Sequence, residues 1–244
     1  MPRSSRAAQH LPISVAAIAD QGSQRPTLPV CALMGAPLAR RAATVAILVS
    51  SVAVARAFSQ WTLLTERSLG RANAPVTIYE MSDFQCPYCR AFALTTLPAL
   101  EREYMATGKV RFVFVNFPLT QAHPYALIAA EVAMCVATQG LFWRFHDLTF
   151  RHQIDWEDQV DPIPYLKALA DSAGARAAPL ARCVDERTSE SVVQADIASA
   201  TRIGVSTTPT FFIEGGLIEG AAPLDVFQQV LDSIYGAKVR VTSH

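Results

Sequence analysis

Hydrophobic and polar residues alternate along the chain in patterns that predict strands and helices in a definite order. Most residues from Val76 to Met81 are β-branched or aromatic, which predicts a strand. The nearly unbroken apolar run from Val110 to Val115 predicts a second strand that is covered on both faces. Between them, apolar residues recur at helical spacing from Arg90 to Thr107, and Gly108 ends this predicted helix. Pro98 is expected to kink the helix, because proline removes a backbone hydrogen bond.

The second half of the chain predicts a helical block followed by a hairpin and a last helix. Helical patterns fill residues 121 to 202, and His123 before Pro124 is expected to open the first of these helices. Two short apolar stretches, Thr210 to Ile213 and Leu217 to Glu219, flank Gly215-Gly216, which predicts a β-hairpin. The final helix is expected to run from Pro223 to Tyr235.

This order of elements predicts an α/β fold with a helical insertion. A crossover between parallel strands needs only about a dozen residues. Here the whole stretch from residue 120 to residue 209 separates the second strand from the hairpin. We therefore expect a helical insertion over residues 121–203, with the surrounding sheet built from residues 74–120 and 204–238.

Charge is distributed unevenly along the 244 residues, although 21 basic and 21 acidic groups balance overall. Residues 1–57 hold six Arg and one Asp, so the rest carries 15 basic and 20 acidic groups. This mildly acidic body has no run of Lys or Arg, which argues against nucleic-acid binding.

The amino-terminal part has the pattern of a secretory signal peptide. Arg40-Arg41 precede an uncharged run from Ala42 to Ala55, and Ala55-Arg56-Ala57 offers small residues at a cleavage site. A membrane-spanning helix needs about 20 residues, and this run is shorter. An uncleaved membrane anchor and a buried first helix of the domain remain alternatives to a cleaved signal peptide. Starting the signal at Met34 divides this region into an untranslated or disordered leader (1–33), a signal peptide (34–57) and a connector (58–73). The mature protein is then expected to be periplasmic or otherwise extracytoplasmic.

Five cysteines occur, and excluding Cys31 with the leader leaves an even number in an exported chain. Cys135 and Cys183 both lie in the predicted helical block. They are either a structural disulfide or two inert buried thiols, and an oxidising compartment favours the disulfide.

Cys86 and Cys89 flank Pro87-Tyr88 where the first predicted strand meets the first predicted helix. Free N–H groups at a helix start stabilise an anion, so we expect the Cys86 pKa to fall into the range of roughly 3.5–7.5. Cys86 would then attack disulfides as the nucleophile, and Cys89 would resolve the mixed disulfide. The alternatives are half of a zinc site or a structural crosslink, but no second C-x-x-C or H-x-x-x-H motif offers further zinc ligands. We therefore expect neither a metal nor a bound cofactor.

Several segments resemble the DsbA-like branch of the thioredoxin superfamily. They are Asn73-Ala74-Pro75-Val76, Ser82-Asp83-Phe84-Gln85-Cys86-Pro87-Tyr88-Cys89, Asn116-Phe117-Pro118-Leu119, Gln139-Gly140-Leu141-Phe142-Trp143 and Gly204-Val205-Ser206-Thr207-Thr208-Pro209-Thr210-Phe211. They cover residues 70 to 235 in the family's order. The resemblance implies a thioredoxin fold with an inserted helical domain, and a role in forming disulfides in exported proteins.

The same resemblance implies roles for single residues. Cys86 would be the nucleophile, Cys89 the resolving thiol and Pro209 a cis-proline beside them, with the Thr208 backbone pairing with an extended substrate. Glu80, six residues before Cys86, would transfer a proton to or from Cys89. The alternative for Glu80 is an ordinary exposed glutamate at a sheet edge.

Three functions remain open at this point. The expected one is a dithiol oxidase that donates its disulfide to newly exported proteins with free thiols. A disulfide reductase or isomerase, or a chaperone that merely retains the motif, are the alternatives. The family's isomerases carry an additional dimerisation domain, for which residues 58–73 leave no room, and this disfavours an isomerase. A monomer is expected. Thr208 departs from the aliphatic residue usual in the family's oxidases and keeps a reductase open. By resemblance, a quinone-linked thiol oxidase in the membrane would reoxidise the pair.

Overall fold

The computed structural model describes residues 63–242 of the chain. The predicted leader and signal peptide, residues 1–33 and 34–57, lie outside the described residues, as does the beginning of the predicted connector. Within residues 63–242, no helix is both long and apolar enough to cross a membrane.

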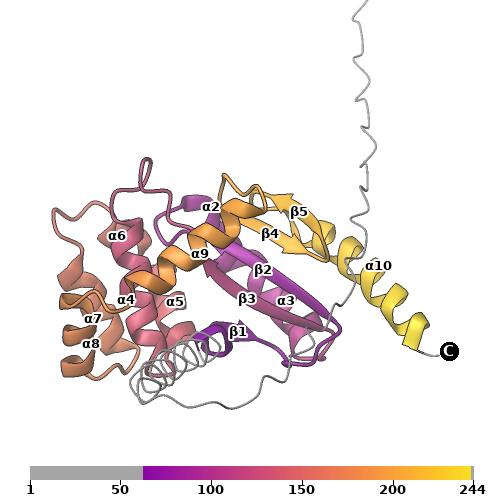
Figure 1. Ribbon diagram of the computed structural model, residues 1–244, viewed down its shortest axis with the longest axis horizontal. Helices are drawn as coiled ribbons and strands as arrows, with labels where there is room; N and C mark the ends of the chain where they lie inside the picture. Colours follow the sequence, from indigo (N-terminus) through magenta and orange to yellow (C-terminus); the bar gives the residue numbers. More distant parts are fainter. Residues whose placement is uncertain (1–62, 243–244) are drawn as a thin grey trace, which may run out of the picture. The chain divides into compact units, whose positions relative to one another are not determined.

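A five-stranded mixed sheet forms the centre of the described fold, with the strand order β1-β3-β2-β4-β5 (Figure 1). The strands are β1 (Ser68–Leu69), β2 (Val76–Ser82), β3 (Val110–Asn116), β4 (Thr210–Ile213) and β5 (Gly216–Glu219). β2 and β3 run parallel, with Val76 opposite Val110 and Ser82 opposite Asn116. Their carboxyl ends therefore meet at the same edge of the sheet. Nearly all side chains of both strands are buried, as expected for central strands covered on both faces.

One continuous helical segment from Pro87 to Met105 connects these two strands. It consists of α2 (Pro87–Ala91), the π-helical turn η1 (Phe92–Thr96), α3 (Leu97–Leu100) and a second π-helical turn η2 (Glu101–Met105). The disturbance expected at Pro98 takes the form of these wider turns on both sides of α3. Pro98 has no N–H to bond the carbonyl of Leu94, so the helical hydrogen-bond register changes there. The segment also begins at Pro87, before the predicted start at Arg90.

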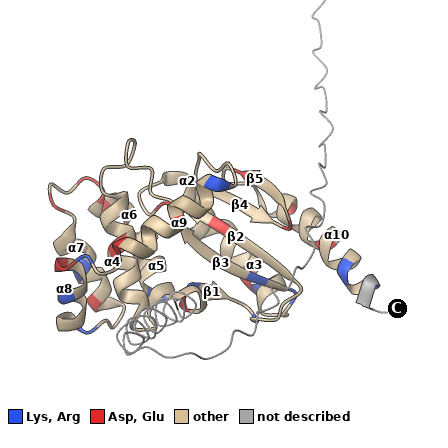
Figure 2. Cartoon of the chain, viewed as in Figure 1, with Lys and Arg blue, Asp and Glu red and all other residues tan. Residues whose placement is uncertain are grey.

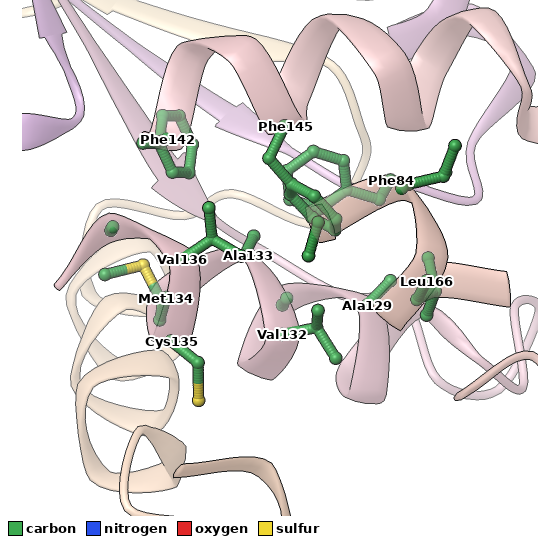
Figure 3. Packing of buried hydrophobic residues seen from close by; sticks show 14 of the residues in the cluster. Phe84, Ala129, Val132, Ala133, Met134, Cys135, Val136, Phe142, Phe145 and Leu166 are labelled. Carbon is green, nitrogen blue, oxygen red and sulfur yellow. The ribbon is translucent and has the colours of Figure 1, made fainter. Parts of the chain in front are cut away.

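Between β3 and β4 the described chain forms a helical block. Its helices are α4 (Ala126–Ala137), α5 (Phe142–Arg151), α6 (Gln153–Trp156), α7 (Ile163–Ser172), α8 (Ala177–Asp185) and α9 (Glu190–Arg202). α4 is the centre of the block and is almost entirely buried. Figure 3 shows Phe84, which precedes Cys86, among side chains of α4 and among Phe142 and Phe145 of α5. The helical block and the segment leading to Cys86 thus share one hydrophobic core.

A second hydrophobic cluster joins the sheet to α10 (Leu224–Thr242) and to the helical segment after Cys86. The ring centroids of Phe92 and Phe211 lie 4.5 Å apart, and those of Phe211 and Phe227 lie 4.8 Å apart. Full burial of such a side chain stabilises the fold by roughly 1.5–3 kcal/mol. This cluster fixes the helical segment of residues 87–105 against β2 and β4.

The predicted α/β fold with a helical insertion is confirmed, and three details differ. Part of the predicted connector is regular, because residues 63–66 form a helical turn and β1 pairs antiparallel with β3. The first helix of the block begins at Ala126, after the predicted start at His123. α10 continues to Thr242, beyond the predicted end at Tyr235.

Candidate active site

Cys86 and Cys89 lie where β2 passes into the helical segment. Cys86 is the residue just before α2 and has extended backbone angles, φ −76° and ψ 124°, as is typical of an N-cap residue. Both sulfurs are free thiols, and both side chains are buried. The hydrophobic cores on the two sides of this junction hold the pair at the carboxyl edge of the sheet.

Cys86 faces the loop that precedes β4. Its thiol donates a hydrogen bond to the backbone carbonyl of Thr208, with 3.4 Å between sulfur and oxygen. The peptide bond between Thr208 and Pro209 is cis. The structure therefore brings together Cys86, Thr208 and Pro209, which lie more than a hundred positions apart in the sequence.

The surroundings of Cys86 lower its pKa from 9.0 to about 6. The largest cause is a hydrogen bond from the Cys89 side chain, and the Thr208 hydroxyl and the backbone N–H groups of Cys89 and Tyr88 act in the same direction. Burial opposes them, because it disfavours the charged form. At neutral pH the sulfur of Cys86 is therefore mostly a thiolate.

Cys89 is shifted the other way. Its side chain is fully buried, and this burial is the main reason why its pKa lies well above 9.0, followed by the hydrogen bond to Cys86 and the negative charges of Cys86 and Glu80. The backbone N–H of Asp83 points at the Cys89 sulfur from 3.5 Å. The two thiols thus have opposite protonation states at neutral pH.

Glu80 is a buried residue of the central strand β2 rather than an exposed residue at a sheet edge. It is the acidic position that Figure 2 shows on β2. Neither carboxylate oxygen has a hydrogen-bond partner among the described residues. Burial raises the Glu80 pKa from 4.5 to about 8; the Ser82 hydroxyl opposes this shift and the charge of Cys86 adds to it. Glu80 therefore holds a proton at neutral pH. When it loses this proton at higher pH, its negative charge raises the pKa of Cys89 further.

Sequence reasoning missed the side chains that hold the turn before Cys86. The buried carboxylate of Asp83 accepts the backbone N–H groups of Gln85 and Leu119, each at 2.8 Å. It also lies 2.7 Å from Nδ1 of His123, for which the sequence had suggested only a place at the start of a helix. The Gln85 amide oxygen accepts the backbone N–H of Tyr125 at 2.8 Å. The contacts with His123 and Tyr125 each join residues 40 positions apart, so no local sequence pattern predicts them.

Gln153 is a further residue that the sequence did not single out. Its side chain is buried, and its Nε2 lies 2.8 Å from the carbonyl oxygen of Phe84 and 3.0 Å from that of Cys86. Gln153 belongs to α6, so the helical block directly contacts the turn of residues 83–86, called the reactive turn below.

The other two cysteines of the described chain are separate from this site. Cys135 of α4 and Cys183 of α8 form a disulfide, with 5.8 Å between their Cα atoms and 48 positions between them in the sequence. Within residues 63–242, no cluster of three or more His, Cys, Asp or Glu side chains is arranged to hold a metal ion.

Comparisons with known proteins agree with this geometry. A family model described as thioredoxin matches residues 62–233. The disulfide bond formation protein D of Bacillus subtilis is 27% identical over 165 residues, which cover 67% of this chain and 74% of that protein. The crystal structure of oxidised BdbD from Bacillus subtilis is similar with a TM-score of 0.64 and 26% identity, and the match covers 70% of this chain and 92% of that one.

A different kind of relative matches over a similar stretch. The Na⁺/H⁺ antiporter NhaA 3 of Salinispora tropica is 33% identical over 168 residues, which make up 69% of this chain. The match covers only 24% of the antiporter's length, so the likeness concerns one segment of that protein. From the family match and the similar solved structures, we conclude that this chain belongs to the thioredoxin superfamily, in its DsbA-like branch.

Proposed function

We propose that this protein is an exported dithiol oxidase that introduces disulfides into other exported proteins through Cys86 and Cys89. The contrast between the two sulfurs supports this most directly, because the pKa of Cys86 is lowered to about 6 and that of Cys89 is raised. A thiolate at Cys86 stabilises the reduced pair at neutral pH. The oxidised pair therefore gives its disulfide readily to a client.

In the first step, a thiolate of the client attacks the Cys86 sulfur of the oxidised pair. A bond forms between the client sulfur and Cys86, the bond between Cys86 and Cys89 breaks, and its electron pair moves to Cys89. The Asp83 N–H lies 3.5 Å from the Cys89 sulfur and would stabilise the new thiolate there. Glu80, protonated because its pKa is about 8, would give Cys89 a proton.

In the second step, another thiolate of the client attacks the first client sulfur. A client disulfide forms, the bond to Cys86 breaks, and Cys86 leaves with the electron pair as a thiolate. The client has lost two electrons and the enzyme pair has gained them. Cys86 is a good leaving group in this step, because its lowered pKa stabilises the thiolate.

Thr208 and Pro209 would bind the client chain. The Thr208 carbonyl oxygen lies 3.4 Å from the Cys86 sulfur, so a client strand that pairs with this backbone would bring its sulfur to Cys86. Proline has no N–H that could compete for the sulfur. We further propose that exported proteins with free thiols are the clients, that the protein acts as a monomer, and that a quinone-linked thiol oxidase of the membrane reoxidises it.

The test is the redox equilibrium of the Cys86/Cys89 pair with glutathione, together with oxidation of a synthetic dithiol peptide. We expect a reduction potential closer to the about −120 mV of DsbA than to the about −270 mV of thioredoxin. Cys86→Ser should abolish peptide oxidation, whereas Cys135→Ala/Cys183→Ala, which lacks the other cysteine pair, should retain it. A potential near that of thioredoxin would instead identify a reductase.

A further inference from the structure

The carbonyl groups of the reactive turn are held by one side chain of the helical block. The amide nitrogen of Gln153 contacts the carbonyl oxygens of Phe84 and Cys86 at 2.8 and 3.0 Å. Both partners are acceptors, so only the NH₂ group of the side-chain amide satisfies them. Gln153 is buried, so these hydrogen bonds do not compete with water.

The hydrogen bond from Gln153 to the Cys86 carbonyl restrains the orientation of the Cys86 peptide group, and this orientation determines where the Cys86 sulfur lies. The Cys86 carbonyl also accepts the Arg90 N–H at 3.1 Å, which is the first hydrogen bond of the helical segment. No side chain caps this helix start by a hydrogen bond. Instead the extended backbone of Cys86 leaves its own sulfur near the N–H groups of Tyr88 and Cys89, which lower its pKa. The orientation of the Cys86 peptide therefore decides whether the sulfur meets these donors.

The position of Gln153 is itself fixed by the core. α6 is a short helix, and its last residue, Trp156, is fully buried and donates its indole N–H to the Thr149 carbonyl at 3.0 Å. The amide of Gln153 is thus presented to the turn by an element that cannot easily move. Asp83 and Gln85 anchor the turn at earlier residues, through Leu119, His123 and Tyr125. Gln153 reaches the carbonyl of the reactive cysteine.

We propose that Gln153 is a positioning residue for the thiol–disulfide reaction, which holds the Phe84 and Cys86 carbonyls so that the Cys86 sulfur stays close to the first N–H groups of the helical segment. The inference rests on the proposed function in taking Cys86 as the reactive sulfur. It adds that the helical insertion, and not only the sheet and its following helix, sets the reactivity of that sulfur.

The test is Gln153→Met, which keeps the length of the side chain and removes its N–H donors. In the reduced full-length protein, the thiolate absorbance of Cys86 is titrated against pH. We expect the midpoint to rise by about half to one pH unit, as the loss of one or two buried hydrogen bonds that orient the peptide implies. The equilibrium with glutathione should shift about three- to tenfold towards the Cys86–Cys89 disulfide.

Ser189→Ala is the matched control. It also removes a buried side-chain hydrogen bond in the helical block, from the Ser189 hydroxyl to the Glu131 carbonyl at 2.9 Å, and neither partner is among the residues that hold the turn or α6. We expect it to leave the Cys86 midpoint where it is in the parent protein. Gln153→Asn serves as a second variant in case Gln153→Met does not fold. It keeps a buried amide, but its side chain is one methylene too short to reach both carbonyls, so it should also raise the Cys86 midpoint.

A folded Gln153→Met or Gln153→Asn protein with the parent's Cys86 midpoint and glutathione equilibrium would overturn the inference. So would an equal change in Ser189→Ala, because Gln153 would then act only through general stability. Neither result bears on the proposed function, which depends on peptide oxidation by the parent protein and its loss in Cys86→Ser.

Discussion

At the scale of single residues, two chemically identical thiols have different pKa values because their sulfurs have different surroundings. Cys86 meets hydrogen-bond donors and the Thr208 carbonyl, whereas Cys89 is enclosed beside Glu80. Burial penalises charge on Cys89, while hydrogen bonds outweigh the same penalty at Cys86. One sulfur is thereby prepared to attack and to leave, and the other to accept a proton.

Replacing Glu80 by Gln is expected to slow peptide oxidation about tenfold or more at neutral pH, because Cys89 loses its proton donor. The parent's rate should fall as pH rises through about 8, the pKa of Glu80, and the variant's should lack this step. Stopped-flow measurement of peptide oxidation from pH 6 to pH 9 shows both effects. Glu219→Gln on the exposed strand β5 is the control; an unchanged rate and pH profile in Glu80→Gln would exclude the role.

The residues found from the sequence are those with a local signature. Cys86 and Cys89 form a short motif at a strand–helix junction, and Glu80, Thr208 and Pro209 followed from the family resemblance. Gln153 could not be found in this way, because its two partners lie 67 and 69 positions away. The contacts of Asp83 with Leu119 and His123 likewise span 36 and 40 positions. A glutamine in a short helix has no pattern that distinguishes a buried amide from an exposed one.

At the scale of elements, the disulfide between α4 and α8 joins two helices of the insertion. Cys135 is fully buried in the centre of the block, and Cys183 is partly buried. α8 has few buried residues of its own, chiefly Leu180 and Val184. We therefore expect the disulfide to contribute a large part of the free energy that keeps α8 packed on α4.

Removing this link with Cys135→Ala/Cys183→Ala is expected to lower the free energy of unfolding by about 4 kcal/mol. The estimate comes from the chain entropy of a loop closed over 48 positions. Urea denaturation of the two proteins at pH 7 measures it, and the thiolate titration of Cys86 should stay unchanged. A loss below about 1 kcal/mol would show that the disulfide does not constrain the unfolded chain as this argument assumes.

The sequence predicted elements best where the pattern is long. β2, β3 and the hairpin were expected nearly at their observed positions, because β-branched runs and the Gly215-Gly216 turn are strong signals. β1 has two residues and is formed only by pairing with the edge of β3, so no periodicity could reveal it. The π-helical turns around Pro98 likewise depend on how the helix packs rather than on its residue pattern.

At the scale of the whole molecule, the redox state of the site and the stability of the fold are coupled. In the reduced protein the pKa of Cys86 is about 6, against 9.0 for the ordinary value that the unfolded chain approaches. A lowered pKa stabilises the folded state fully above the unfolded value, and this contribution is lost as pH falls through the folded value. In the oxidised protein neither sulfur titrates, so the contribution is absent.

The unfolding free energy of the reduced form, minus that of the oxidised form, should therefore increase from pH 6 to pH 9. The slope is about 1.4 kcal/mol per pH unit, so Cys86 contributes about 1.4 kcal/mol to this difference at pH 7 and roughly 3.5 kcal/mol at pH 9. Glu80 opposes stability as pH rises through its pKa of about 8. We expect this effect in both redox forms, so that most of it cancels in the difference. Urea denaturation of both forms at four pH values measures this difference, with peptide mass analysis verifying that Cys135–Cys183 stays intact. A difference independent of pH would mean that Cys86 is no thiolate in the folded protein, and the argument for an oxidase would lose its physical basis.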